Sequence, residues 1–382
     1  MSDQVEQTTE KKVINIMPLK KGRRILVFLA DFFLNFIIAF LLFFAACFPL
    51  GKAMTGYKAK NNQYVKNLDD RATVLLSNKI LFTNAEADLS DISYHVDFTS
   101  DCFLSYYALD IESPENVKYS QFGHKEENQV FHTYFISIMD DSDRFITLFD
   151  TYNAKHEYFV RDGIEITLKE EIKSEISTHF YKKEAVTSLG KKYLKALKNE
   201  VYFPMYSEIM DSIAKNDLTY NDLSYNKIQS QIKGFEKYIY TLVEFTSIIA
   251  AVISTTVFYL IIPLTNRSRK TIGMLILKTE RVNIRSLGYL KKREVVLNLV
   301  YQLFMIFIIT FFIPMTTLSF TEMFKIQLLF ILAIFSILIL LLNFVFLLFD
   351  KFNRSLFDRL LNVVNLTNAD LDEVYRAKGY YL

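Results

Sequence analysis

The sequence predicts an integral membrane protein with an all-α unit of four transmembrane helices and an α+β domain inserted between the first two of them. The 382 residues are 51% hydrophobic and yet 23% charged, a combination that indicates very apolar runs joined to ordinary polar sequence. The apolar residues are gathered in long runs, and short basic segments lie beside those runs. A long polar stretch without a run of spanning length separates the first run from the second.

The first apolar run follows a polar start. Residues 1–21 are expected to be a cytoplasmic lead, and residues 22–51 contain a run long enough to cross a hydrocarbon core of about 30 Å. A cleaved signal peptide is the competing interpretation, because basic residues precede the run and Phe44-Ala-Ala-Cys47 loosely imitates a lipoprotein cleavage site. The length of the run and the acid within it favour a retained helix.

Residues 52–237 are the polar insert, predicted to be an extracytoplasmic α+β domain. Alternating apolar and polar residues predict a small antiparallel sheet in its first part. The predicted strands are 94–98, 130–138 and 158–166. Asp162-Gly163 suits a tight hairpin turn. The second part is predicted to be helical, with a long helix from about Leu223 that leads into the second span.

Residues 238–350 contain the other three predicted spans, at 239–264, 295–312 and 326–349. The loop at 265–294 is strongly basic. Because short loops rich in Lys and Arg stay in the cytoplasm, we expect a multi-pass protein of the cell membrane with both termini cytoplasmic. Residues 351–382 follow the last span, and 351–364 are predicted to form a helix that lies in the inner membrane interface.

The first apolar run contains one aspartate, Asp31, and a charged side chain in a membrane helix is expected either to pair with an opposite charge or to have a function. An ionised carboxylate at the centre of a spanning helix costs about 2.5–3.5 kcal/mol on insertion scales. Arg24 precedes Asp31 by seven residues, close to two helical turns, so both lie on one face. Arg293 and Asp358 fall on the same side of the membrane in this topology, and what singles out these two residues is the family resemblance described below. We therefore predict a charge cluster of these four residues, which is either a structural anchor or a proton or cation site.

Five further polar residues fall within the predicted spans. They are Asn35, Glu244, Asn298, Gln302 and Asn343. The amides are expected to form hydrogen bonds between helices. Glu244 lies near the outer end of its span, where the headgroup region solvates it. A polar permeation path needs more such residues, which counts against a channel.

Four stretches resemble, in order, the signatures of the RDD family of bacterial membrane proteins. They are 24–31, with its arginine and aspartate, 266–277, 286–294, with Arg293, and 356–364, with Asp358. The resemblance covers residues 18–51 and 239–366 and leaves the insert uncovered. It implies a four-helix membrane unit and an association with transport, including cation/proton antiport.

Several classes of site lack their residues. The two cysteines, Cys47 and Cys102, cannot form a disulfide framework, and no two of the five histidines have metal-ligand spacing. The histidines are His95, His124, His132, His156 and His179. The acidic stretch 139–143 lacks the glycine and distal glutamate of a calcium loop. No nucleophile elbow or phosphate-binding glycine loop occurs. We expect no enzyme, metal, cofactor or nucleic-acid partner.

Two functions stay open. The resemblance favours an RDD-type membrane protein that transports ions or small solutes. Alternatively, the chain is a membrane-anchored binding or assembly protein whose extracytoplasmic domain captures a protein or ligand partner. The lipid bilayer is a partner in both cases, and assembly as a homo-oligomer is compatible with either.

Overall fold

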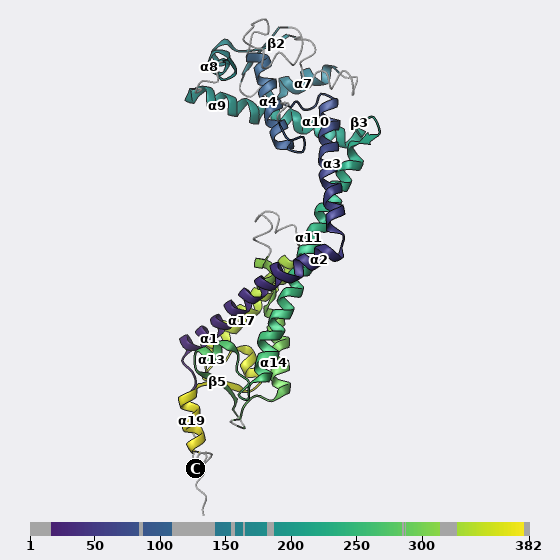
Figure 1. Ribbon diagram of the computed structural model, residues 1–382. Helices are drawn as coiled ribbons and strands as arrows, with labels where there is room; N and C mark the ends of the chain where they lie inside the picture. Colours follow the sequence, from purple (N-terminus) through teal and green to yellow (C-terminus); the bar gives the residue numbers. More distant parts are fainter. Residues whose placement is uncertain are drawn as a thin grey trace, which may run out of the picture. The chain divides into compact units, whose positions relative to one another are not determined.

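The chain divides into two compact units. The computed structural model describes residues 17–83, 87–108, 142–153, 157–162, 165–181, 187–284, 286, 288–313 and 327–377. Residues 1–58 and 237–382 form one unit, called the membrane unit below, and residues 59–236 form the insert unit. Each has its own apolar core, and Figure 1 labels the elements of both.

Four helical stretches in the described chain are long and apolar enough to cross a membrane, so the prediction of four such helices is confirmed. The stretches are Lys21–Met54, Tyr225–Thr265, Lys292–Phe312 and Leu328–Phe349. Their elements are α1 (Lys21–Leu42), η1 (Phe43–Cys47) and α2 (Phe48–Met54); α11 (Tyr225–Thr256), η4 (Val257–Ile261) and α12 (Ile262–Thr265); α14 (Lys292–Met305) and α15 (Phe307–Phe312); and α17 (Gln327–Phe349). The elements η1 and η4 are single π-helical turns, a form frequently found at functional sites.

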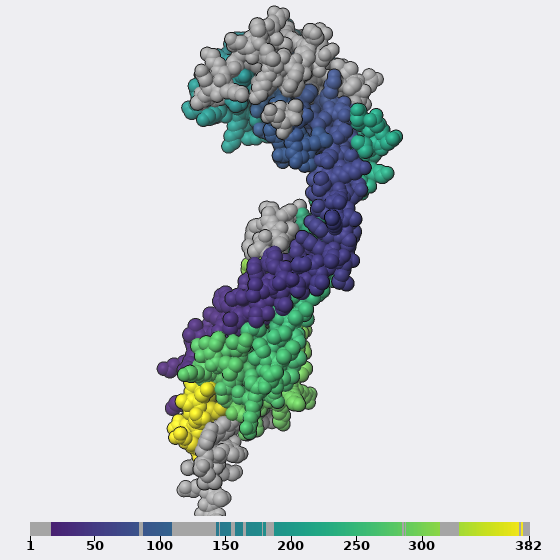
Figure 2. Space-filling model, in the orientation of Figure 1, coloured from purple at the N-terminus to yellow at the C-terminus, as the bar shows by residue number. Residues whose placement is uncertain are grey.

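The outer faces of these helices are apolar. On α1, the purple helix of the membrane unit in Figure 2, the exposed large side chains are Leu26, Phe33, Ile37 and Leu41. The opposite face of α1 packs into a core with Ala39 and Phe43 fully buried. A soluble protein rarely exposes apolar patches of this extent, whereas lipid acyl chains solvate them. The exposed faces therefore agree with a membrane protein.

A small sheet lies at the end of the membrane unit where α1 begins (Figure 1). Its strands are β5 (Thr279–Asn283) and β6 (Val363–Thr367), which pair antiparallel with Thr279 opposite Thr367. Three helices adjoin it: α13 (Ile272–Ile276), α18 (Leu356–Leu360) and α19 (Asn368–Ala377). The basic loop and the segment after the last span therefore fold together rather than lying apart.

The predicted interfacial helix over 351–364 is wrong. Only α18 is helical there, and Val363 and Val364 are fully buried in β6. The apolar residues are spaced as on one face of a helix, which is why a helix was predicted. The two valines are β-branched, however, and favour a strand when another strand is available for pairing. That partner, β5, comes from the basic loop, far away in the sequence.

The insert unit is mainly helical in its described part. Its helices are α3 (Tyr57–Ser77), α4 (Ile92–Ala108), α7 (Ser142–Asn153), α8 (Glu170–Tyr181), α9 (Ser188–Leu197), the π-helical turn η3 (Lys198–Tyr202) and α10 (Phe203–Asn216). The aromatic rings of Tyr107, Phe149 and Phe159 pack together in its core, with centroids 4.6–5.7 Å apart. Because these rings come from α4, α7 and a hairpin, they join elements distant in the sequence.

The predicted sheet of the insert is confirmed only as a hairpin. β1 (Phe159–Asp162) pairs antiparallel with β2 (Glu165–Leu168), with Asp162 opposite Glu165, and a shorter hairpin joins β3 (Thr219–Tyr220) to β4 (Leu223–Ser224). The predicted strand at 130–138 lies outside the described residues.

The predicted strand at 94–98 is wrong, because these residues belong to α4. The buried side chains of this helix include His95, Thr99, Cys102 and Phe103, which follow the i, i+4, i+7, i+8 spacing of a helix face. A five-residue window is too short to distinguish this period from strand alternation.

Candidate functional site

A buried carboxylate between two arginines lies at the end of the membrane unit next to the small sheet. Arg24 of α1 donates from Nη2 to Asp358 Oδ2 at 2.8 Å, and Arg281 Nε of β5 lies 3.5 Å from Asp358 Oδ1. The exposed fractions are 8% for Arg24, 7% for Arg281 and zero for Asp358. These three residues are called the paired-charge cluster below. It joins the first span, the basic loop and the chain after the fourth span.

Local sequence fixes the position of Asp358. Ser355 and Asp358 form a capping box at the start of α18: the Ser355 N–H donates to Oδ2 of Asp358, and the Asp358 N–H donates to Ser355 Oγ, both at 3.2 Å. Ser followed three residues later by Asp is a recognised pattern for this motif. Asn365 of β6 adds a longer contact to the same oxygen at 3.4 Å. The carboxylate is therefore held in position by α18 and β6 as well as by the arginines.

Electrostatics keep Asp358 ionised. Burial alone would raise the pKa of this carboxyl, but the charges of Arg24 and Arg281 outweigh burial and hold the pKa below its ordinary value. Burial lowers the pKa of Arg281, and Asp358 opposes that shift. The charges of Asp358 and Arg281 thus each depend on the opposite charge beside them.

The arginine of the basic loop in this cluster is Arg281, and not Arg293 as the sequence predicted. Arg293 is the second residue of α14 and is exposed. Arg281 lies at the centre of β5 and donates from Nη1 to Asn298 Oδ1 at 3.2 Å. The only sequence signal for Arg281 is its place in the short run Thr279-Glu-Arg-Val-Asn283, which identifies a strand only once its partner β6 is known.

Asp31 is held separately from the paired-charge cluster. Its Oδ2 accepts a hydrogen bond from the Thr271 hydroxyl at 2.6 Å, and its Oδ1 accepts one from the backbone N–H of Gly273 at 2.7 Å. Thr271 is the N-cap of α13, so the carboxylate of the first span lies at a helix N-terminus, where backbone N–H groups favour an anion. The predicted group of four residues is therefore two neighbouring arrangements.

The contact between α1 and α13 requires a glycine. A Cβ atom added at Gly273 would lie 2.8 Å from Asp31 Oδ1 and 2.8 Å from the carbonyl oxygen of Val27. The first of these atoms is part of the hydrogen bond, and the second is backbone of α1. Only glycine allows this approach without a shift of one of the helices.

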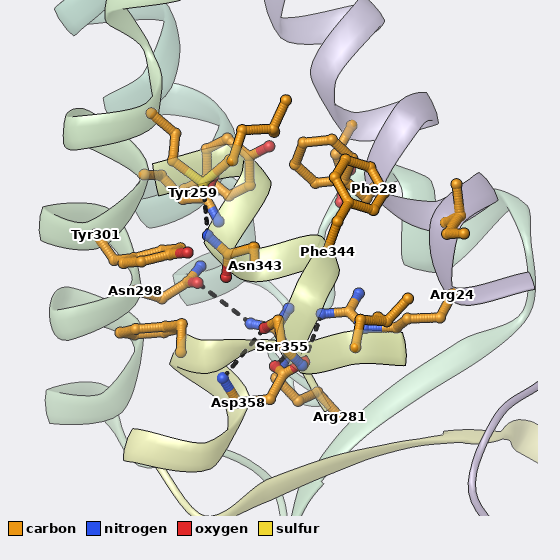
Figure 3. Close-up of a pocket in the computed structure, with 17 residues that line it drawn as sticks. Arg24, Phe28, Tyr259, Arg281, Asn298, Tyr301, Asn343, Phe344, Ser355 and Asp358 are labelled. Carbon is orange, nitrogen blue, oxygen red and sulfur yellow. Dashed lines mark hydrogen bonds and ion pairs between the residues drawn. The ribbon is translucent and has the colours of Figure 1, made fainter. Parts of the chain in front are cut away.

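A cavity of about 60 Å³ lies between the two arrangements and the spans. Figure 3 shows Arg24, Arg281, Ser355 and Asp358 at one end, Phe28 and Phe344 on one wall, and Tyr301 and Asn298 on another. Its remaining lining residues are Ile25, Asp31, Tyr259, Gln302, Met305, Leu340, Asn343, Leu347 and Phe357. One water needs about 10–15 Å³ by this measure, so the cavity has room for roughly four.

Three of the five predicted intramembrane polar residues line this cavity: Asn298, Gln302 and Asn343. The first contacts Arg281, as described above, and Asn343 donates to the backbone carbonyl of Ile339 at 2.8 Å. These three of the four predicted amides thus lie together around the cavity.

Asn35 has a different place, between α1 and α11. It donates to Thr255 Oγ1 at 3.0 Å, and the Ser254 hydroxyl donates to Asn35 Oδ1 at 2.6 Å. All three residues are buried, so these bonds join the first two spans. This is the interhelical role expected of amides in a membrane.

Replacing Asn35 by alanine is expected to destabilise the membrane unit moderately. Hydrogen bonds between transmembrane helices contribute about 0.6 kcal/mol on average and about 1.7 at most. Thermal unfolding of the purified protein in detergent would measure the loss. Val300→Ala, on an exposed apolar position of α14, is the control and should leave the unfolding temperature close to that of the wild type. Equal unfolding of the Asn35 variant and the wild type would contradict the role.

Glu244 is half-buried and lies outside the cavity lining. Its carboxyl group lies close to the backbone N–H of Leu329 near the start of α17, and its Oε1 atom is buried without a hydrogen-bond partner among the described residues. Glu244 therefore lies at the contact with α17 rather than in the cavity wall.

The arrangement places two arginines and two aspartates beside a small cavity whose other walls are largely apolar. Across the part of the chain that the structure describes, no three His, Cys, Asp or Glu side chains are grouped to hold a metal ion. No protein-family model, curated protein or solved structure matches this chain.

Proposed function

We propose that this chain is an integral membrane protein of RDD type whose helical unit moves a small ion or polar solute across the bilayer. The observation that carries the proposal is the cavity between the spans, with Arg24, Arg281, Asp31 and Asp358 in its wall. Ionisable groups within membrane bundles are costly and typically mark solute or ion pathways. If the charged residues only held the helices together, their ion pairs would suffice and a cavity beside them would serve no purpose. The resemblance over residues 18–51 and 239–366 supports the same conclusion.

The proposed topology places both termini and the basic loop in the cytoplasm and residues 59–236 outside it. The excess of Lys and Arg in the loop at 265–294 supports this orientation. Long domains translocate largely regardless of their own charge, so the polar insert does not oppose it.

Cysteine labelling in intact cells is expected to follow this topology. With Cys47 and Cys102 replaced by alanine, Ser188→Cys should react with a membrane-impermeant maleimide in whole cells. Glu373→Cys should react only after lysis; both positions are exposed. Labelling in the reverse order would contradict the orientation and leave the four spans unaffected.

Proteoliposomes containing the full-length protein are expected to show flux of a small ion or solute above that of protein-free vesicles. Asp31→Asn removes a charge from the cavity wall, and we expect it to lower the flux to about a tenth, equivalent to about 1.4 kcal/mol. Flux would be measured with a pH-sensitive dye and with radiolabelled solutes. Asp372→Asn, which removes an exposed charge from α19, is the matched control and should leave flux unchanged. An unchanged rate in Asp31→Asn, in protein that melts like the wild type, would dismiss the proposal.

A membrane-anchored binding protein is the second candidate, and the separate core of the insert unit favours it. In this case the helices only hold residues 59–236 at the membrane. The test is complementation of a growth defect in a strain that lacks the gene. A variant in which a short Gly/Ser linker replaces those residues should fail to restore growth. The Asp31→Asn variant should restore growth fully. Rescue by the linker variant and failure of Asp31→Asn would favour transport instead.

A further inference from the structure

We infer that the cavity binds a small solute with no net charge that carries both hydrogen-bond donors and acceptors, such as a short zwitterion or a small amide. The inference names the substrate class of the proposed transport function and rests on it. It depends on three observations about the cavity wall: its balanced charge, its unpaired polar atoms and its size.

The charges around the cavity balance. Counted at their formal charges, Arg24 and Arg281 contribute two positive charges, and Asp31 and Asp358 contribute two negative charges. Further ionisable groups in the lining are phenols, which are neutral at ordinary pH. An ion that binds among these side chains brings a charge that the wall does not compensate, and an uncompensated buried charge is strongly unfavourable. A solute without net charge avoids that cost.

The wall contains buried polar atoms of both kinds without a hydrogen-bond partner among the described residues. They are the Nε atoms of Arg24 and Arg281, the hydroxyl of Tyr301, and the Oδ1 atoms of Asn343 and Asp358. The 3.5 Å from Arg281 Nε to Asp358 Oδ1 is too long for a good hydrogen bond, so this ion pair leaves both atoms without a close hydrogen-bond partner. Guanidinium N–H groups donate only, and the two carbonyl-type oxygens accept.

A ligand that forms hydrogen bonds with both the donors and the acceptors of the cavity wall must itself have both hydrogen-bond acceptors and donors. A bare cation would contact only the acceptors, and a simple anion only the donors, which leaves the other group buried and unsatisfied. A zwitterion matches both, because its carboxylate accepts from the guanidinium groups and its ammonium donates to Asp358 and Asn343. An amide matches both with its carbonyl and N–H groups.

The size of the cavity suits a small solute. Room for roughly four waters corresponds to a solute of about four or five non-hydrogen atoms, such as glycine or urea. The rings of Phe28 and Phe344, 6.2 Å apart between centroids, close one wall.

Uptake by proteoliposomes of the full-length protein tests the inference, with radiolabelled glycine, urea, sodium and chloride as the probes. We expect uptake of glycine, urea or both above that of protein-free vesicles. Tyr301→Phe and Asn343→Leu should each lower it about fivefold, the change expected for one hydrogen bond of about 1 kcal/mol. Tyr301→Phe keeps the ring that stacks on Phe357 with centroids 4.4 Å apart, so its thermal unfolding should match the wild type. Tyr240→Phe, outside the cavity lining, is the matched control.

The outcomes separate this inference from the proposed function. Flux of sodium or chloride with no uptake of glycine or urea would overturn the inference and leave the transport function standing. Water permeation alone, or uptake that neither cavity variant lowers, would also overturn it. No flux of any probe would remove both proposals together.

Discussion

Asp358→Ala is expected to lower the free energy of unfolding of the membrane unit by about 3–5 kcal/mol, the cost of removing one partner of a buried ion pair. The reason is that Arg24 and Arg281 keep their charges and their burial while losing the carboxylate that neutralises them. Thermal or denaturant unfolding of the purified protein in detergent would measure the change. The capping box of α18 is lost at the same time, so the sheet next to it should loosen as well.

A second substitution and a control distinguish this explanation from general damage. Adding Arg24→Met to Asp358→Ala removes one of the two buried positive charges that the first substitution leaves without a carboxylate. The double variant should therefore regain part of the lost stability. Glu373→Ala, at an exposed position of α19, should unfold like the wild type. If Asp358→Ala melted at the wild-type temperature, the paired-charge cluster would have no role in stability.

Acid pH should act on the same carboxylate. The pKa of Asp358 in the folded protein lies below the reference value of 3.8. Its contribution to stability is therefore fully present above about pH 4 and is lost as the pH falls through the folded-state pKa. Asp358→Asn has no such group and should show a weaker loss of stability over this acid range than the wild type does.

Gly273→Ala is expected to cost about 3 kcal/mol or more, from an overpacked contact and a disrupted hydrogen bond to a carboxylate. The added Cβ would lie 2.8 Å from Asp31 Oδ1 and from the Val27 carbonyl oxygen. A rotation of the Asp31 side chain relieves only the first contact, because the second is with the backbone of α1. Unfolding in detergent would detect the loss, and flux through the cavity should fall with it because Asp31 lines the cavity.

Gly22→Ala is the matched control for this variant. It adds the same methyl group in the first turn of α1, where nothing lies within 4 Å of the new atom. Alanine favours a helix over glycine by about 1 kcal/mol at interior positions, so stability should be unchanged or slightly higher. Equal unfolding temperatures for Gly273→Ala and Gly22→Ala would show that α1 and α13 do not pack as closely as 2.8 Å implies.

The four membrane helices and the residues inside them were predictable from the sequence. A spanning helix is identified by its own run of apolar residues, and an amide or acid within that run is evident without knowledge of its neighbours. Asp31, Asn298 and Asn343 were therefore found as candidates, and Asp358 followed from the family resemblance. The hairpin near Asp162 was equally local, since its two strands adjoin in the sequence.

Which of these candidates meet each other was decided only by the tertiary structure. The pairing of β5 with β6 brings Arg281 to Asp358 in place of Arg293 and converts the expected interfacial helix into a strand. Thr271 and Gly273 reach Asp31 because α13 packs on α1. Local patterns record which residues are apolar, charged or helix-forming, and they carry no information about contacts between segments far apart in the chain. The charge-balanced cavity is made of such contacts, so it could be found only in the folded protein.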